Sequence, residues 1–218
     1  MGILNKEAIN IQYRLKNYKI LAKDNPDYYN LDIASILQQL AREYRADNKL
    51  KEAQESYIEA LELYRDLAEI NSTLFKPYIA SILYNLALIY YDSNKKEDAQ
   101  IAYKKSLKIY KDLATQDSTT FNLDVAATLD SLALVYRDNN QLDKAEEAYD
   151  EALEIYKNLV NIDSNRYSIE YANSIVFAFY SISKPKYDIN RAKEILKPYI
   201  NKPRAKQLLE FIDELNQS

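Results

Sequence analysis

The chain has 218 residues, of which 47% are hydrophobic and 28% are charged, and its formal net charge is −4. No uninterrupted apolar run approaches the roughly 18 residues that predict a membrane-spanning helix. The acidic balance and the lack of a basic run argue against nucleic acid or a membrane as a partner, because neutralising phosphate groups supplies most of the affinity in such contacts.

Several residue types are missing, and their absence excludes whole kinds of site. The sequence has no Cys and no His, and its one glycine is Gly2. This rules out disulfides, thiolate or imidazole metal ligands and glycine-rich phosphate loops. No cofactor is expected, and an enzyme would have to work with Asp, Glu, Lys, Tyr and Ser. The start of the chain has no basic segment followed by an apolar one, so we expect a cytoplasmic location.

The first helical pattern covers residues 5–24, where Leu15, Tyr18 and Leu21 recur on one face. The residues Leu61, Tyr64 and Leu67 follow these by 46 positions each. We therefore predict a leading helix that corresponds to the second helix of a later pair.

Three full helix pairs are predicted next, over residues 27–70, 73–115 and 119–161. Their first helices read ASILQQLAREY from Ala34, ASILYNLALIY from Ala80 and AATLDSLALVY from Ala126, a step of 46 residues. Apolar residues at i, i+3, i+4 and i+7 place one face of each helix inward. The second helices repeat in the same step, with small and aromatic residues at Ala53, Ala99, Ala145, Tyr57, Tyr103 and Tyr149.

Asparagines mark the turns. Asn48, Asn94 and Asn140 are again 46 residues apart, and Asn tolerates the left-handed backbone conformation that ends a helix. Between pairs, Asn or Asp followed by Ser or Pro favours a helix end and a new start, and Pro77 is predicted as the first residue of a helix.

Residues 167–218 are predicted to form a degenerate repeat with a capping helix. Phe179 stands where earlier pairs have a small Ala, and Lys184-Pro185 and Lys197-Pro198 interrupt the pattern. The segment Pro203–Leu215 reads as a final helix whose inward side chains are Leu208, Leu209, Ile212 and Leu215.

The helix pairs are expected to stack. Small residues such as Ala41 and Ala53 let the helices of a pair approach closely, and one pair cannot bury both of its faces. We predict a single all-α domain over residues 1–218, an α-solenoid of helix pairs.

The pattern Leu86-Ala87, Tyr90, Ala99, Tyr103 and Ser106-Leu107 resembles the tetratricopeptide repeat, in the extended form of kinesin light chains and many bacterial proteins. The resemblance covers residues 27 to about 160 well. It implies a right-handed superhelix of antiparallel helix pairs, with the first helices lining a concave surface. It also implies a non-enzymatic scaffold whose partner is a protein or peptide.

On this resemblance, positions that stacking does not use form a ligand-facing stripe on the first helices. The predicted stripe is Gln38, Gln39, Arg42 and Arg45, then Tyr84, Asn85, Leu88 and Tyr91, then Asp130, Ser131, Leu134 and Arg137. Amides can bind peptide backbone, arginines can pair with an acidic side chain or a terminal carboxylate, and the Tyr and Leu side chains can form an apolar floor. An ordinary solvated helix face is the alternative for each residue. Chaperone-binding members of the family use basic residues where this chain has Asp130 and Leu134, so that ligand is not expected.

Other interpretations stay open. The abrupt start inside a second-helix pattern favours a regulatory or sensory arm of a larger chain, and self-association is a further possibility. An enzyme built on carboxylates and tyrosines is a third. Glu146-Glu147 are interpreted as solvated charge, and Tyr57, Tyr103 and Tyr149 as core aromatics whose hydroxyls reach solvent or backbone.

Overall fold

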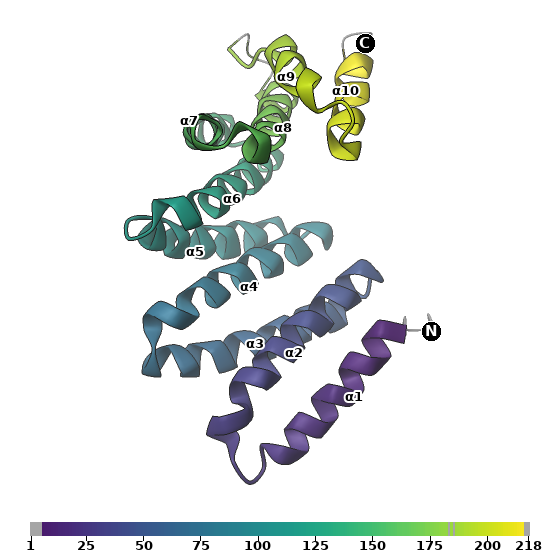
Figure 1. The fold of residues 1–218 in the computed structure, drawn as a ribbon, viewed down its shortest axis with the longest axis vertical. Helices are drawn as coiled ribbons and strands as arrows, with labels where there is room; N and C mark the ends of the chain where they lie inside the picture. The colour runs from purple at the N-terminus through teal and green to yellow at the C-terminus, as the bar shows by residue number, and fades with distance from the viewer. Residues whose placement is uncertain (1–5, 183, 185, 216–218) are drawn as a thin grey trace. The chain divides into compact units, whose positions relative to one another are not determined.

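The computed structural model describes residues 6–182, 184 and 186–215, and every regular element in these ranges is helical (Figure 1). The expectations about the first five residues and about Pro185 concern positions outside them. The helices are α1 (Lys6–Leu21), α2 (Pro26–Ala46), α3 (Leu50–Ile70), α4 (Ser72–Asp92), α5 (Lys96–Ala114), α6 (Ser118–Asp138), α7 (Leu142–Ile162), α8 (Ser164–Ile182), α9 (Ile189–Leu196), the 3₁₀ helix η1 (Lys197–Tyr199) and α10 (Pro203–Leu215).

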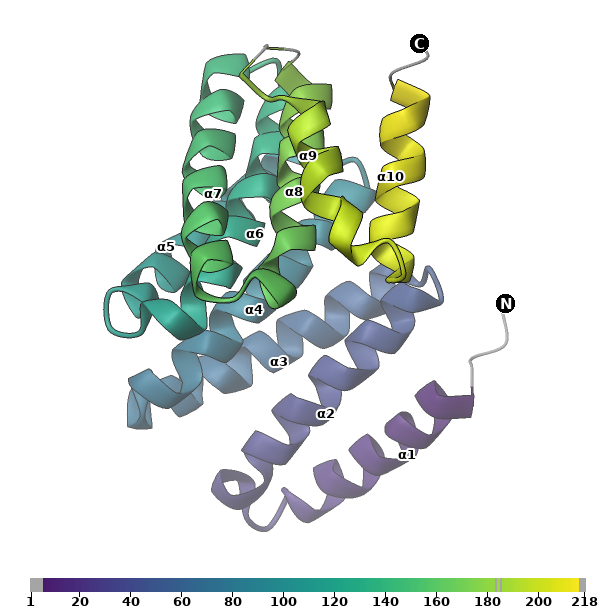
Figure 2. The same ribbon diagram turned by 45° about the horizontal axis from the view of Figure 1, so that its top comes forward.

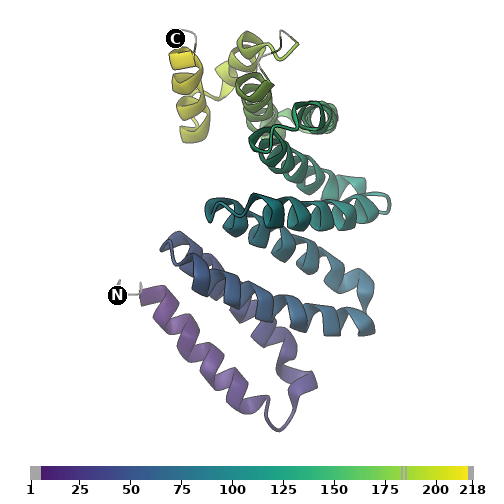
Figure 3. The ribbon, with the colours of Figure 1, turned by 180° about the vertical axis from the view of Figure 1, so that it is seen from behind.

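The described residues form two compact units, and the boundary between Ile109 and Tyr110 falls inside α5. In the N-terminal unit, α1, α2, α3 and α4 pack in sequence order, and α1 and α2 form a hairpin that Figure 3 shows from behind. In the C-terminal unit, α6, α7 and α8 run side by side, and α9 and α10 pack against α8 (Figure 2). Each unit is thus built from consecutive helices, as a helical repeat protein requires.

The turns inside the helix pairs confirm the asparagine prediction. Asn48, Asn94 and Asn140 have φ angles of 57°, 58° and 57°. In the first turn the amide of Lys49 donates to the carbonyl of Tyr44 at 2.7 Å, and the amide of Asn48 donates to Arg45 at 3.0 Å. This pair of bonds is the Schellman motif, in which a left-handed residue lets the last carbonyls of a helix find partners.

The helix starts follow the prediction in part. The side chains of Asn71, Asp117 and Asp163 accept a hydrogen bond from the amide three residues later, which caps the following helix. Pro26 is the first residue of α2. The prediction for Pro77 is wrong, because α4 already starts at Ser72 behind the Asn71 cap. Pro77 lies in the second turn, where it removes one helical hydrogen bond.

The predicted core is confirmed. Each pair has one small alanine on its first helix and one on its second, and all six are fully buried: Ala41, Ala87, Ala133, Ala53, Ala99 and Ala145. The aromatics Tyr57, Tyr103 and Tyr149 are fully buried as well. The final helix has the predicted bounds, with Ile212 buried and Leu208, Leu209 and Leu215 half-buried. Replacing Tyr57, Tyr103 or Tyr149 by a small residue would open a large cavity in the core.

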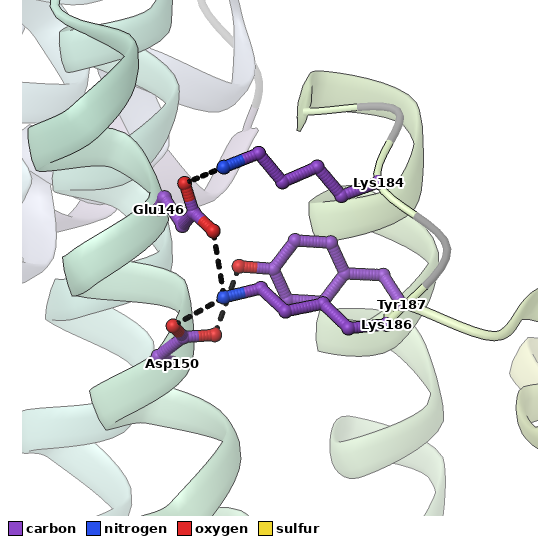
Figure 4. Close-up of polar contacts among 5 residues, drawn as sticks. All are labelled: Glu146, Asp150, Lys184, Lys186 and Tyr187. Carbon is purple, nitrogen blue, oxygen red and sulfur yellow. Dashed lines mark hydrogen bonds and ion pairs between the residues drawn. The ribbon is translucent and has the colours of Figure 1, made fainter.

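The connection between α8 and α9 is held to α7 by a polar cluster (Figure 4). Lys186 Nζ lies 2.6 Å from Asp150 Oδ2 and 2.7 Å from Glu146 Oε1, and Lys184 also pairs with Glu146. The Tyr187 hydroxyl donates to Asp150 Oδ1 at 2.9 Å. Hydrogen bonds from the two lysines lower the pKa of the Glu146 carboxyl. Glu146 is therefore an anchor for this connection and not the solvated charge that the sequence suggested.

Candidate ligand-binding site

The twelve residues of the predicted stripe differ in exposure. Arg42 is exposed, Gln38 and Asp130 are buried, and the other nine are half-buried. The stripe residues of α2 and α4 belong to the N-terminal unit, and those of α6 belong to the C-terminal unit, so each set is described within its own unit.

Three stripe residues of the N-terminal unit converge on one hollow of about 370 Å³. Arg42 and Arg45 come from α2 and Asn85 comes from α4, and Tyr57 of α3 forms part of the wall. The turn after α2 also contributes to the lining. We call this cavity the Arg45 hollow; its remaining lining residues are Ala46, Asn48, Leu50 and Asp92.

Two residues that line the Arg45 hollow each have a buried polar atom with no hydrogen-bond partner among the described residues, namely the Tyr57 hydroxyl and Arg45 Nε. The Arg45 side chain is 35% exposed, so its tip is open to solvent while Nε is covered. At that tip, Nη2 lies 3.5 Å from Asp92 Oδ2, a long contact between exposed groups that contributes little stability. Burial raises the pKa of Tyr57 to about 12, although the charges of Arg42 and Arg45 act in the opposite direction.

The orphaned hydroxyl corrects one sequence-based expectation. Tyr57 was expected to send its hydroxyl to solvent or to backbone, and it reaches neither. Leaving such a buried donor unsatisfied costs about 1–3 kcal/mol, and native proteins contain few of them. No pattern in the sequence distinguishes Tyr57 from Tyr103 and Tyr149, because all three occupy the same repeat position.

In the C-terminal unit, the residues at the same repeat positions as Arg45 and Tyr57 do have hydrogen-bond partners. Arg137, two repeats after Arg45, donates from Nε to Asp138 Oδ1 at 2.9 Å, and its Nη2 lies 2.7 Å from the same oxygen. Its Nη1 donates to Ser181 Oγ at 3.3 Å. The hydroxyl of Tyr149, two repeats after Tyr57, shares a hydrogen bond of 2.9 Å with Ser181 Oγ. The position two repeats before Ser181 is Ile89, which has no polar side-chain group to offer.

Asp130 points into the C-terminal unit. Its Oδ1 accepts a hydrogen bond of 2.7 Å from Ser174 Oγ of α8, and a further bond links it to Tyr156. Burial raises the pKa of this carboxyl to about 7, despite the two hydrogen bonds that lower it. Asp130 is thus a packing contact between α6 and α8, and its carboxylate does not face a ligand as the sequence suggested.

Three other stripe residues make contacts within their own unit. Asn85 Nδ2 donates to the carbonyl of Ser81 at 2.8 Å, and the Ser131 hydroxyl donates to Ala127 at 2.9 Å. Tyr84 packs edge-to-face on Tyr103, with ring centroids 5.4 Å apart. These contacts hold the side chains in place and leave part of each exposed.

Two further kinds of site were sought in the part of the chain that the structure describes. It contains no group of three or more carboxylates that could hold a metal ion. No helix within it combines the length and apolar character needed to cross a bilayer.

Comparison with known proteins identifies the repeat. Two family models of the tetratricopeptide repeat match the chain, one at residues 33–72 and 125–166 and the other at residues 57–112. Together they cover more than half of the chain, which belongs to the tetratricopeptide repeat family. No curated protein matches the sequence.

Two solved structures show the same fold. BtubC (BKLC) from P. vanneervenii has a TM-score of 0.59 and 17% identity, over 98% of this chain and 93% of that chain. The nearly identical TPR-like repeats of a putative kinesin light chain from Podosopora anserina have a TM-score of 0.59 and 15% identity, over 94% of this chain and 90% of that chain. The resemblance to kinesin-light-chain repeats is therefore confirmed at the level of the fold.

Proposed function

We propose that this protein is a non-enzymatic interaction scaffold that binds a peptide or a partner helix along its first helices. The observation that carries the proposal is the convergence of Arg42, Arg45 and Asn85, from two different first helices, on one hollow. Charged and amide groups of this kind recognise the backbone and the acidic groups of a peptide. The half-buried Tyr84 and Leu88 add apolar surface on α4.

The stripe residues of the C-terminal unit contribute less to the proposed surface. Asp130 is buried against α8, and Arg137 is satisfied by Asp138 and Ser181. Leu134 remains half-buried and can extend an apolar contact. We therefore place the principal contact on α2 and α4. The lack of Cys and His leaves few groups suited to acid–base or nucleophilic catalysis, which favours binding over an enzymatic role.

A random peptide library displayed against the purified chain tests this proposal. Peptides that the wild-type protein enriches should bind at least about tenfold more weakly to a Tyr84→Ala, Asn85→Ala, Arg42→Ala triple variant, since each change removes a contact worth about 1 kcal/mol. The control is a Glu62→Ala, Glu69→Ala variant, which alters exposed residues of α3 instead. Equal binding to the wild type and the triple variant, with unchanged circular dichroism, would contradict the proposal.

A further inference from the structure

We infer that a separate hollow between α1 and α2 binds a single-chain anionic amphiphile, that is, an alkyl chain that ends in an anionic head group. This hollow has a volume of about 400 Å³, which lies within the range of small-molecule sites. We call it the α1 groove; its lining residues are Gln12, Leu15, Lys16, Lys19, Ile20, Lys23, Leu40 and Tyr44. It belongs to the N-terminal unit and shares no lining residue with the Arg45 hollow, so the inference is independent of the proposed peptide binding.

Aliphatic side chains supply the apolar part of the α1 groove. Leu40 of α2 is buried, Leu15 of α1 is half-buried and Ile20 of α1 is exposed, so apolar surface continues from the core to the outside. Gln12 Nε2 donates a hydrogen bond to the Tyr44 hydroxyl and so joins the two helices that form the groove. An alkyl chain that lies against these side chains is removed from water together with them, which favours binding.

The charge of the α1 groove favours an anion. Among the described residues, its lining contains three lysines and no carboxylate. Lys19 Nζ lies 2.6 Å from Glu59 Oε1 of α3, whereas Lys16 and Lys23 make no ion pair with the described residues. The three lysines are spaced i, i+3 and i+7 along α1, so neighbouring charges repel one another. An anionic head group beside them would offset this repulsion.

The equivalent groove one repeat later has a different charge pattern. Leucines again stand at the positions of Leu15 and Leu40, but Asp98 of α5 joins Arg65 and Lys105 in the lining. That groove is also smaller, at about 260 Å³. Of these two equivalent grooves, the α1 groove therefore has the stronger preference for a ligand that is both apolar and anionic.

The outer face of α1 extends the apolar surface beyond the groove. Ile9, Tyr13 and Ile20 are 52%, 66% and 52% exposed, and a helix of 3.6 residues per turn places them within about 40° of one another around its axis. In α3 the three equivalent positions are all acidic: Glu55, Glu59 and Asp66. Apolar surface that is exposed where a sister helix is charged is typical of a binding surface.

The acidic face of α3 favours a single amphiphile over a bilayer surface. The contact between Lys19 and Glu59 places this face directly beside α1, and the exposed Glu55 and Glu62 lie one turn to either side of Glu59. A broad anionic membrane that reached α1 would also approach these carboxylates and be repelled by them. One head group can remain beside the lysines and avoid them.

Isothermal titration calorimetry of the full chain tests the ligand chemistry, with monomeric sodium decanoate as the probe. Decanoate should bind saturably, and octanoate should bind about tenfold more weakly, because each fully buried methylene contributes about fourfold in affinity. Decyl maltoside, which has the same alkyl chain and a neutral head group, should bind at least about threefold more weakly than decanoate. No binding of decanoate, equal affinity for octanoate, or equal affinity for decyl maltoside would each overturn the inference.

Substitutions in the full chain test the position of the site. Ile20→Asn gives α1 the residue that α7 has at the same repeat position, so the fold should tolerate it, and it should weaken decanoate binding about tenfold. A Lys16→Gln, Lys23→Gln double variant should weaken it about three- to tenfold. The matched control is Lys104→Gln, Lys108→Gln, which removes two exposed lysines of α5 and should leave binding unchanged. Unchanged affinity in either site variant, or an equal loss in the control, would overturn the inference.

A sedimentation assay with phosphatidylglycerol vesicles tests the membrane alternative. The chain should stay in the supernatant with these vesicles while it binds monomeric decanoate. Sedimentation of the chain with the vesicles, without binding of monomeric decanoate, would overturn the inference in favour of a membrane surface.

Discussion

Two places in this molecule have the same repeat residues and opposite hydrogen bonding. Arg45 and Tyr57 in the N-terminal unit occupy the same repeat positions as Arg137 and Tyr149 in the C-terminal unit. The second pair is saturated by Asp138 and Ser181, whereas the first leaves Arg45 Nε and the Tyr57 hydroxyl without partners. The repeated residues set where the polar groups lie, and the neighbours that do not repeat decide whether those groups are satisfied internally or remain available.

The largest expected effect concerns Asp130, another polar group that the C-terminal unit satisfies internally. Its folded-state pKa of about 7 lies above the unfolded value near 4. The folded protein therefore binds more protons than the unfolded chain between these values, and this group lowers stability as pH rises from about 4 to about 7, by at most about 1.4 kcal/mol per pH unit. Urea unfolding of wild type and Asp130→Asn should differ in pH slope across this window. If the free energy of unfolding of both proteins changed with pH in the same way, Asp130 would be charged in the folded protein across this window.

The turn asparagines should respond equally in both units, because their backbones are alike. Asn48→Ala and Asn140→Ala each place a β-carbon residue without a helpful side chain at a φ near 57°, and each should cost about 1 kcal/mol of unfolding free energy. Asn48→Gly and Asn140→Gly are the matched controls and should be close to neutral. Unequal costs at the two sites, measured by chemical denaturation, would show that the backbones of the units differ in strain.

Tyr149→Phe tests the saturated side of the comparison. It removes a hydroxyl that shares a 2.9 Å bond with Ser181 and leaves that serine with Arg137 as its remaining partner. We expect a loss of about 1 kcal/mol in the free energy of unfolding, the usual contribution of one intramolecular hydrogen bond. An unchanged midpoint in thermal or urea unfolding would mean that the bond contributes nothing.

Tyr57→Phe tests the unsaturated side and should have the smallest effect, with the opposite sign. The lost hydroxyl has no partner, so its removal should leave stability unchanged or raise it by up to about 1 kcal/mol. The measurement is the same unfolding experiment as for Tyr149→Phe, run in parallel. A loss as large as that of Tyr149→Phe would show that the Tyr57 hydroxyl is bonded in solution and would end the contrast between the units.

Local sequence patterns predict the helices, the turns and the pairing of the helices. Apolar spacing, the alanines that permit close approach and the asparagines at 46-residue intervals act through neighbours on the same helix or in the adjacent turn. The prediction that Pro77 begins a helix is wrong for a local reason too. The Asn71 cap starts α4 at Ser72, and a proline is tolerated in the early turns of a helix.

Whether a polar side chain finds a partner depends on how the helices pack against one another. Asp130 accepts a hydrogen bond from Ser174, and Glu146 pairs with Lys184 and Lys186, partners that lie roughly 35 to 45 positions away along the chain. The Tyr57 hydroxyl has no such partner among the described residues. A helical period identifies the face of a helix on which a residue lies, but the groups opposite that face come from other helices. Whether a buried donor or acceptor is hydrogen-bonded depends on those opposing atoms. Repeats with the same residues at equivalent positions therefore differ in their hydrogen bonding where the residues of the neighbouring helices differ.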